Sequence, residues 1–181
     1  MTRFGYVMMT YFATMGVAVA AFIPTPVKVI WNASASAPIG FYTIEPVGWL
    51  EVPDLVAVVP PKPLARFMAE RGYVGRGAPL LKRVVGLPGQ RVCRSGRTIT
   101  VDAVEMSEAL ERDRFGRELP VWQGCRVIAD GEIFLMNWEV RDSLDGRYFG
   151  PIPASSVIGR ATPLWTDEED DGRYQWRAPT H

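Results

Sequence analysis

The chemistry open to this chain of 181 residues depends on one serine, Ser36, one lysine, Lys82, and the lack of a suitable histidine. The single histidine, His181, is the last residue, and chain ends are usually poorly ordered. A Ser-His-Asp or Cys-His arrangement therefore has no suitable base. A hydrolase on this chain has to activate its nucleophile with a lysine or a carboxylate.

The surroundings of Lys82 favour a lysine that loses its proton near neutral pH. A lysine ordinarily titrates at about 10.4, and burial among apolar groups lowers its pKa. In a strand, Lys82 shares one face with Leu80 and Val84, whereas Arg83 points to the other face and to water. A lone lysine is ordinarily a surface residue, so a role as base depends on this burial.

Ser36 is followed by Pro38 and Gly40, residues that favour a tight, exposed turn. A nucleophilic hydroxyl needs such a turn, because the substrate carbonyl must approach it without steric conflict. Taken alone, the segment is also typical of an ordinary Ser/Ala-rich turn. The prediction of a nucleophile therefore depends on the rest of the pattern.

The N-terminal segment is apolar and long enough to cross a membrane. Residues 4–23 carry no charge, and a helix of about 20 residues spans a hydrocarbon core of about 30 Å. Arg3 precedes this segment, which by the positive-inside rule places the N-terminus in the cytoplasm and the rest on the periplasmic side of an inner membrane. The segment is either an uncleaved anchor or a signal peptide with Ala18-Val19-Ala20 as the cleavage site. A buried core helix is disfavoured, because no polar face appears at helical spacing.

Charge and cysteine content exclude several classes of function. The chain has 20 basic and 20 acidic side chains, and the basic residues form no stripe, so we expect no nucleic-acid partner. Two cysteines, Cys93 and Cys125, cannot build a four-cysteine zinc site, and we expect no metal or other cofactor. In an oxidising compartment the two cysteines form a disulfide; the alternative is two buried free thiols.

Short runs rich in β-branched and aromatic residues, bounded by Pro and Gly, predict a mainly β domain. One short helix is expected at 63–71, between Pro63 and Gly72. Residues 102–114 are either a short helix or an excursion from a sheet, and residues 141–153 are expected to form a structured loop. The expected strands lie at 27–31, 41–44, 54–59, 81–85, 91–93, 98–101, 126–128 and 132–136, with turns at Ser95-Gly96 and Asp130-Gly131.

Three motifs occur in an order known from one protein family: SAPIGFY at residues 36–42, KRVVGLPG at 82–89 and DSLDGRYFGPIP at 142–153. Because these motifs follow an apolar N-terminal segment, the chain resembles the type I signal peptidase superfamily. The resemblance is closest to its TraF branch, the maturation peptidases of conjugative-transfer systems. Further marks of that branch are DRFGR at 113–117, LPVWQGC at 119–125 and GEIFL at 131–135.

The resemblance implies a division into three regions. Residues 1–26 are the membrane anchor or signal segment, and residues 27–165 are a signal-peptidase-like β catalytic domain. Residues 166–181 are expected to be an acidic, mobile tail, because the run 167–171 consists of Asp and Glu alone.

The resemblance also implies roles for single residues. Ser36 is the nucleophile and Lys82 its general base, together a Ser/Lys dyad. Ser34 is the side-chain donor to the oxyanion, beside the backbone N–H of Ser36. Ser143 is the hydroxyl that orients the lysine.

Two further residues of the third motif, Asp145 and Arg147, are expected to form a structural ion pair that holds this loop. Asp145 is also a candidate for a part in catalysis. The family often has a serine where this chain has Gly146, so a hydrogen bond from that position is missing.

The function that follows from the resemblance is a membrane-associated serine endopeptidase. It would process a pilin precursor for conjugative transfer, by leader cleavage at small side chains and by pilin cyclisation if an amine of the pilin resolves the acyl-enzyme. Other proteins of the conjugation apparatus are further partners. The expected location is the inner membrane with the catalytic domain on the periplasmic side, or the periplasm if the N-terminal segment is cleaved.

Two alternatives are a general type I signal peptidase that trims exported proteins, and a non-catalytic anchored β-domain that scaffolds the transfer apparatus. The short connection from the apolar segment also predicts that Ser36 lies near the membrane surface. Trp31, Phe41 and Trp49 are expected to contact the headgroup region there.

Overall fold

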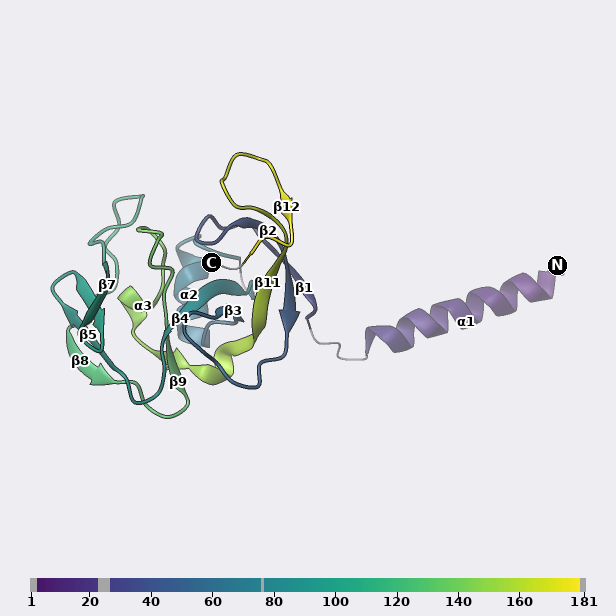
Figure 1. The fold of residues 1–181 in the computed structure, drawn as a ribbon. Helices are drawn as coiled ribbons and strands as arrows, with labels where there is room; N and C mark the ends of the chain where they lie inside the picture. Colours follow the sequence, from purple (N-terminus) through teal and green to yellow (C-terminus); the bar gives the residue numbers. More distant parts are fainter. Residues whose placement is uncertain (1–2, 23–26, 76, 180–181) are drawn as a thin grey trace.

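The structure is a computed structural model that describes residues 3–22, 27–75 and 77–179 (Figure 1). His181 therefore lies outside the described residues, as do the last residues of the predicted anchor. The fold is mainly β, as predicted, with an N-terminal helix that stands apart from two β-sheets. The strands are β1 (Val29–Asn32), β2 (Ile39–Glu45), β3 (Leu55–Val58), β4 (Leu80–Gly86), β5 (Arg91–Ser95), β6 (Thr98–Val101), β7 (Val104–Glu108), β8 (Gly124–Val127), β9 (Glu132–Leu135), β10 (Ile152–Pro153), β11 (Val157–Asp167) and β12 (Gln175–Trp176).

The N-terminal helix α1 (Arg3–Ala21) has no buried residue and is long and apolar enough to cross a membrane. A core helix of a globular domain buries one face, so that alternative is wrong. An anchor and a signal segment both remain consistent with α1, because each requires only length and apolar composition.

The larger sheet carries the predicted site and has the strand order β1-β2-β11-β3-β4-β9-β10, with β12 paired to β11. Its central strand β3 is buried along its whole length, because both faces of the sheet are covered there. Leu55 and Ala57 pack into one core cluster, and Val56 and Val58 pack into another. The expected helix at 63–71 is α2 (Lys62–Glu70), which connects β3 to β4 and buries Met68.

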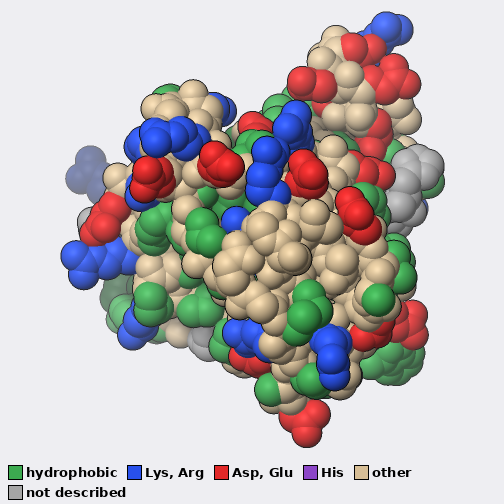
Figure 2. All heavy atoms as spheres, turned by 90° about the vertical axis from the view of Figure 1, so that its left-hand side faces the viewer, with side chains coloured by type: hydrophobic (Ala, Val, Ile, Leu, Met, Phe, Trp, Pro, Cys, Tyr) green, Lys and Arg blue, Asp and Glu red, His purple; other side chains and the backbone are tan. Residues whose placement is uncertain are grey.

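The smaller sheet has the order β7-β6-β5-β8 and begins with the predicted hairpin of β5 and β6. Residues 102–114 are an excursion from this sheet that includes β7, so the helix alternative is wrong. Cys93 and Cys125 lie directly opposite each other on β5 and β8 and form a disulfide, which excludes two free thiols. Figure 2 views the molecule from the side of the smaller sheet, where acidic and basic side chains are interspersed.

The two strands expected on either side of Asp130-Gly131 do form, as β8 and β9, but they belong to different sheets. The turn with Gly131 (φ +78°) therefore carries the chain from the smaller sheet to the larger one. Side chains from both sheets meet in one cluster, which includes Ile99 of β6 and Phe134 of β9.

Two loop predictions need correction. The segment 141–153 contains a short helix, α3 (Gly146–Phe149), and the strand β10, because the Asp145 carboxylate accepts the N–H of Arg147 and starts a helical turn. The segment from residue 166 is not simply a mobile tail. Residues 166–167 are the last two residues of β11, and residues 175–176 form β12, which pairs with β11. The 3-10 turn η1 (Ala154–Ser156) directly precedes β11.

Candidate active site

Ser36 lies in the turn between β1 and β2, and the side chain of Asn32 holds this turn from inside. Asn32 is 9% exposed, and its Oδ1 accepts a hydrogen bond from the N–H of Ser34 at 3.1 Å. Its Nδ2 donates to three carbonyls of the turn, those of Ser34, Ala37 and Pro38, at 2.9, 3.0 and 3.0 Å. The turn that presents Ser36 is therefore fixed by an amide that the sequence analysis did not single out.

Gly40 allows the strand after this turn to pass close to β11. A Cβ at this position would lie 2.2 Å from the carbonyl oxygen of Trp165 and 2.7 Å from Cα of Thr166, and its φ of +150° also disfavours a side chain. This close approach of β2 to β11 requires a glycine at position 40, in addition to any role of this residue in the turn.

Lys82 points from β4 toward Ser36, as the predicted dyad requires. Its Nζ lies 3.2 Å from Oγ of Ser36 and 2.8 Å from Oγ of Ser143, and the side chain is 5% exposed. Burial lowers the pKa of Lys82 to about 8, against an opposing effect of the Asp145 carboxylate. The neutral amine is therefore a minor form at pH 7 and the major form above pH 8.

The neighbours of Lys82 follow the predicted alternation only in part. Val84 is buried and Leu80 is half-buried, but Leu81 on the other face is buried as well. Arg83 is half-buried and its guanidinium lies 5.6 Å from the ring centre of Trp138. β4 is central in the sheet, so both of its faces are covered.

Ser34 lies beside Ser36, as the family resemblance implies for an oxyanion donor. Its Oγ is 3.1 Å from Oγ of Ser36, and the backbone N–H of Ser36 points to Oγ of Ser34 at 3.4 Å. Oγ of Ser34 therefore lies within hydrogen-bond distance of both the hydroxyl and the backbone N–H of Ser36.

Asp145 and Arg147 form the predicted ion pair, and both side chains are fully buried. Nε of Arg147 donates to Oδ1 of Asp145 at 2.9 Å, and Nη2 donates to Oδ2 at 2.8 Å. The Arg147 guanidinium also donates to the backbone carbonyls of Asn137, Val140, Arg141 and Ser143 and to Oγ of Ser107. This pair fixes the loop that carries Ser143.

Gly146 has a steric reason to replace the serine that the family often has. A Cβ at this position would lie 2.5 Å from the ring of Phe134 and 2.7 Å from the carbonyl oxygen of Leu135. The large ring of Phe134 therefore leaves no room for a side chain at residue 146.

Asn137 is a second buried amide that the sequence analysis missed. It is 6% exposed, and its Nδ2 donates to the carbonyl of Ser36. The only signal for it in the sequence is a polar residue directly after the apolar strand at 132–136.

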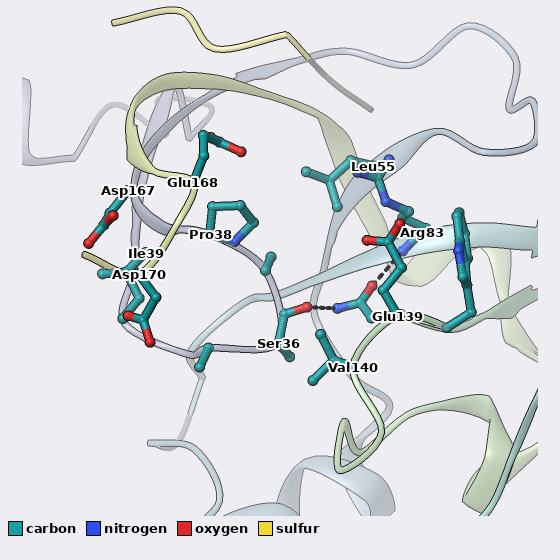
Figure 3. Close-up of a pocket in the computed structure, with 14 residues that line it drawn as sticks. Ser36, Pro38, Ile39, Leu55, Arg83, Glu139, Val140, Asp167, Glu168 and Asp170 are labelled. Atoms are coloured by element: carbon teal, nitrogen blue, oxygen red, sulfur yellow. Dashed lines mark hydrogen bonds between the residues drawn. The ribbon is translucent and has the colours of Figure 1, made fainter. Parts of the chain in front are cut away.

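Two clefts flank Ser36. One, of about 240 Å³, is shown in Figure 3: Glu168 and Asp170 lie on one wall, and Arg83 and Glu139 lie on the other. The second cleft, of about 150 Å³, lies on the side of Ser143. Apolar side chains that include Met68, Leu80 and Leu144 line it together with the charged groups of Asp113, Arg114 and Asp142. Apolar and charged side chains therefore line both clefts.

A mainly β domain in which a buried lysine contacts a serine on a turn fits the class of signal-peptidase-like proteins. Comparison with known families agrees with this class: residues 1–165 match the family described as signal peptidase, peptidase S26, and the chain belongs to that family.

Its relatives connect the chain with conjugation. It is 37% identical over 147 residues to the conjugal transfer protein TraF of Agrobacterium fabrum, which covers 75% of this chain and 81% of that protein. It is 30% identical over 146 residues to the plasmid transfer protein TraF of Escherichia coli, with the same coverage of 75% and 81%. A crystal structure of a signal peptidase I from Enterococcus faecalis aligns at 22% identity and a TM-score of 0.37 over 62% of this chain and 98% of that one. The chain is thus a conjugation-related, signal-peptidase-like protein.

Proposed function

We propose that this protein is a serine endopeptidase that works through a Ser36/Lys82 dyad. The observation that carries the proposal is the position of Lys82, whose Nζ is buried, lies 3.2 Å from Oγ of Ser36 and has a pKa lowered to about 8. An ordinary surface lysine is protonated at pH 7 and cannot accept a proton from a serine.

The reaction begins when neutral Lys82 accepts the hydroxyl proton of Ser36 and Oγ attacks the scissile carbonyl. The hydroxyl of Ser34 and the N–H of Ser36 donate to the oxyanion that forms. The Lys82 ammonium then protonates the leaving amine, and an acyl-enzyme on Ser36 remains. Water or an incoming amine then gives a proton to Lys82 and attacks the ester, and the Lys82 ammonium returns this proton to Oγ as Ser36 leaves. Ser143 keeps the amine of Lys82 oriented throughout, at 2.8 Å.

The proposed substrate is a pilin precursor of a conjugation apparatus. The names of the relatives support a place in conjugal transfer, and the family resemblance supports a precursor with small side chains at the cleavage site. Water as the second nucleophile gives a linear product, and an amine of the same pilin gives a cyclic one.

The proposed location is the periplasmic surface of the inner membrane, with α1 as anchor and residues 27–165 as the catalytic domain. Six residues lie between Phe22, the residue after α1, and Val29, the start of β1, so the seven steps from one to the other reach at most about 25 Å. Three exposed aromatic rings lie side by side across β1, β2 and β11, those of Trp31, Phe41 and Trp165. They flank the turn of Ser36 and suit a headgroup layer. The third predicted contact, Trp49, instead lies in the loop after β2.

The test of the dyad is labelling with a serine-directed acylating agent together with mass spectrometry of the pilin, made with and without this protein. Wild type is expected to be labelled at Ser36 and to shorten the pilin, and both results should be lost in Ser36→Ala and Lys82→Ala. Labelling should speed up as the pH rises through about 8. An unlabelled wild type would favour a non-catalytic scaffold, and trimming of many exported proteins would favour a general signal peptidase.

The membrane location is tested by cleavage of an anchored precursor in vesicles, with full-length protein and with a variant that lacks residues 1–23. The full-length protein is expected to be faster, because both partners are confined to one plane. Equal rates on the anchored precursor would contradict the proposed location while leaving the dyad intact.

A further inference from the structure

β3 pairs with β4 at Lys82, but on the other side of β4 the backbone beside Lys82 has no strand partner in the described part of the chain. β4 pairs with β9 at Val84 and Gly86, and the N–H of residue 136 still donates to the carbonyl of Arg83 at 2.9 Å. Beyond that point the side chain of Asn137 takes the place of a strand. Its Oδ1 accepts the N–H of Arg83 at 3.1 Å, and its Nδ2 donates to the carbonyl of Leu81 at 3.1 Å. One amide thus bonds to the backbone on both sides of Lys82.

The second N–H of the same Nδ2 donates to the backbone carbonyl of Ser36, and Figure 3 shows this bond together with the one that Arg83 donates. Ser36 and Lys82 lie 46 residues apart, and Asn137 lies 101 residues from Ser36. The backbones of the two dyad residues are therefore joined by one side chain. Both N–H groups of its amide are used, so neither is left unpaired in the protein interior.

The backbone of Asn137 is fixed in turn by the buried ion pair. Its N–H donates to Oδ2 of Asp145 at 3.1 Å, and its carbonyl accepts from Nη2 of Arg147 at 3.3 Å. The same arginine donates to the carbonyl of Ser143, whose hydroxyl contacts Lys82. The nucleophile, the base and the residue that orients the base are all tied to Asn137 or to its direct partners.

We propose that Asn137 is a positioning residue that sets the distance and orientation between Ser36 and Lys82, an inference that rests on the proposed function. The position requires two donors and one acceptor in a short planar group. Aspartate has the same shape but lacks both donors. Glutamine has the same amide on a chain that is longer by one methylene, and alanine has no polar group. A displacement of about 1 Å between reacting groups can cost about 100-fold in rate.

The test compares Asn137→Ala and Asn137→Asp with wild type in full-length protein, by peptide cleavage at several pH values and by thermal unfolding. Asn137→Ala is expected to lose on the order of 100-fold in kcat with KM changed by less than about threefold, because the substrate clefts remain and the dyad is displaced. Its pH inflection should stay near that of wild type, because Lys82 stays buried. Asn137→Asp should lose as much kcat and move the inflection to higher pH, since a carboxylate beside Lys82 favours the ammonium.

The matched control is Ile99→Ala, which removes a fully buried side chain from the smaller sheet and is expected to lower the unfolding temperature without changing kcat of the folded protein. A purely structural role for Asn137 would give the same pattern as this control and would overturn the inference. Asn137→Ala with more than a third of the wild-type kcat in an active wild-type background would also overturn it. A wild type without any peptidase activity would overturn the proposed function, and this inference with it.

Discussion

Lys82 and Arg147 are two buried cations of one site, and they differ in what surrounds their charge. Arg147 is completely buried, and Asp145 neutralises it through two hydrogen bonds. Lys82 is 5% exposed, and its Nζ contacts two hydroxyl groups, with no carboxylate at ion-pair distance in the described part of the chain. A buried cation that is paired with a carboxylate, such as Arg147, stabilises the structure. A buried cation without such a partner, such as Lys82, loses its proton more easily.

The physical reason is the cost of removing a charge from water. An ion pair with complete hydrogen bonding offsets this cost for Arg147, and a guanidinium stays protonated in any case. A lone ammonium has no such compensation and responds with a lowered pKa. The two cations thus share one interior but differ in chemistry: Arg147 holds the loop through its ion pair, whereas burial lowers the pKa of Lys82.

The largest expected effect comes from replacing Lys82 by arginine, so that both buried cations are guanidinium groups. Lys82→Arg keeps a positive charge but cannot act as a base near neutral pH, so cleavage should fall by roughly 10³- to 10⁴-fold. Single-turnover cleavage of a pilin peptide measures this loss. Circular dichroism of the same sample should show a folded protein, and substantial processing by Lys82→Arg would remove the lysine-base mechanism.

The next effect comes from removing the counter-charge of Arg147. Asp145→Ala leaves a fully buried guanidinium unpaired and should lower the free energy of unfolding by about 3–5 kcal/mol. Denaturant unfolding measures the change. Glu70→Ala is the matched control, since it breaks the exposed pair Arg66–Glu70 and should cost less than about 1 kcal/mol. Similar losses in both variants would contradict the comparison.

The disulfide offers a change in stability that touches neither cation. Cys93 and Cys125 close a loop with a sequence separation of 32, and loss of the bond should lower the free energy of unfolding by roughly 3.7 kcal/mol in the chain-entropy model. The pH profile of cleavage should not move in Cys93→Ala/Cys125→Ala, because the bond lies in the smaller sheet. A shifted inflection would show that the smaller sheet tunes Lys82.

The smallest expected effect is a gain. The pKa of Lys82 is about 8 in the folded protein against its ordinary value of 10.5, so the buried charge destabilises the fold fully below pH 8 and less as the pH rises toward 10.5. Lys82→Met should therefore be more stable than wild type by about 1–3 kcal/mol at pH 6, and the gain should shrink toward pH 10. Urea unfolding at both pH values measures it. Lys28→Met, at an exposed lysine, should show no such trend.

Eight of the twelve strands in the described residues, the helix near 63–71 and the six residues proposed for the site were predicted from the sequence, whereas the strands β7, β10, β11 and β12 were not. Local alternation and the Pro and Gly boundaries encode these elements, because side-chain periodicity is a property of consecutive residues. The family resemblance implied roles for Ser34, Ser36, Lys82, Ser143, Asp145 and Arg147, and the structure places all six in contact with at least one other member.

Only the tertiary structure decided which distant segments complete the site. Asn137 bonds to a carbonyl 101 residues away, and the acidic run at 167–171 returns to line the cleft beside Ser36. The local sequence does not predict the role of either segment, because an amide after a strand and a run of carboxylates are both typical of a solvated surface. Their roles follow from burial and from long-range hydrogen bonds, and those exist only once the sheets have packed.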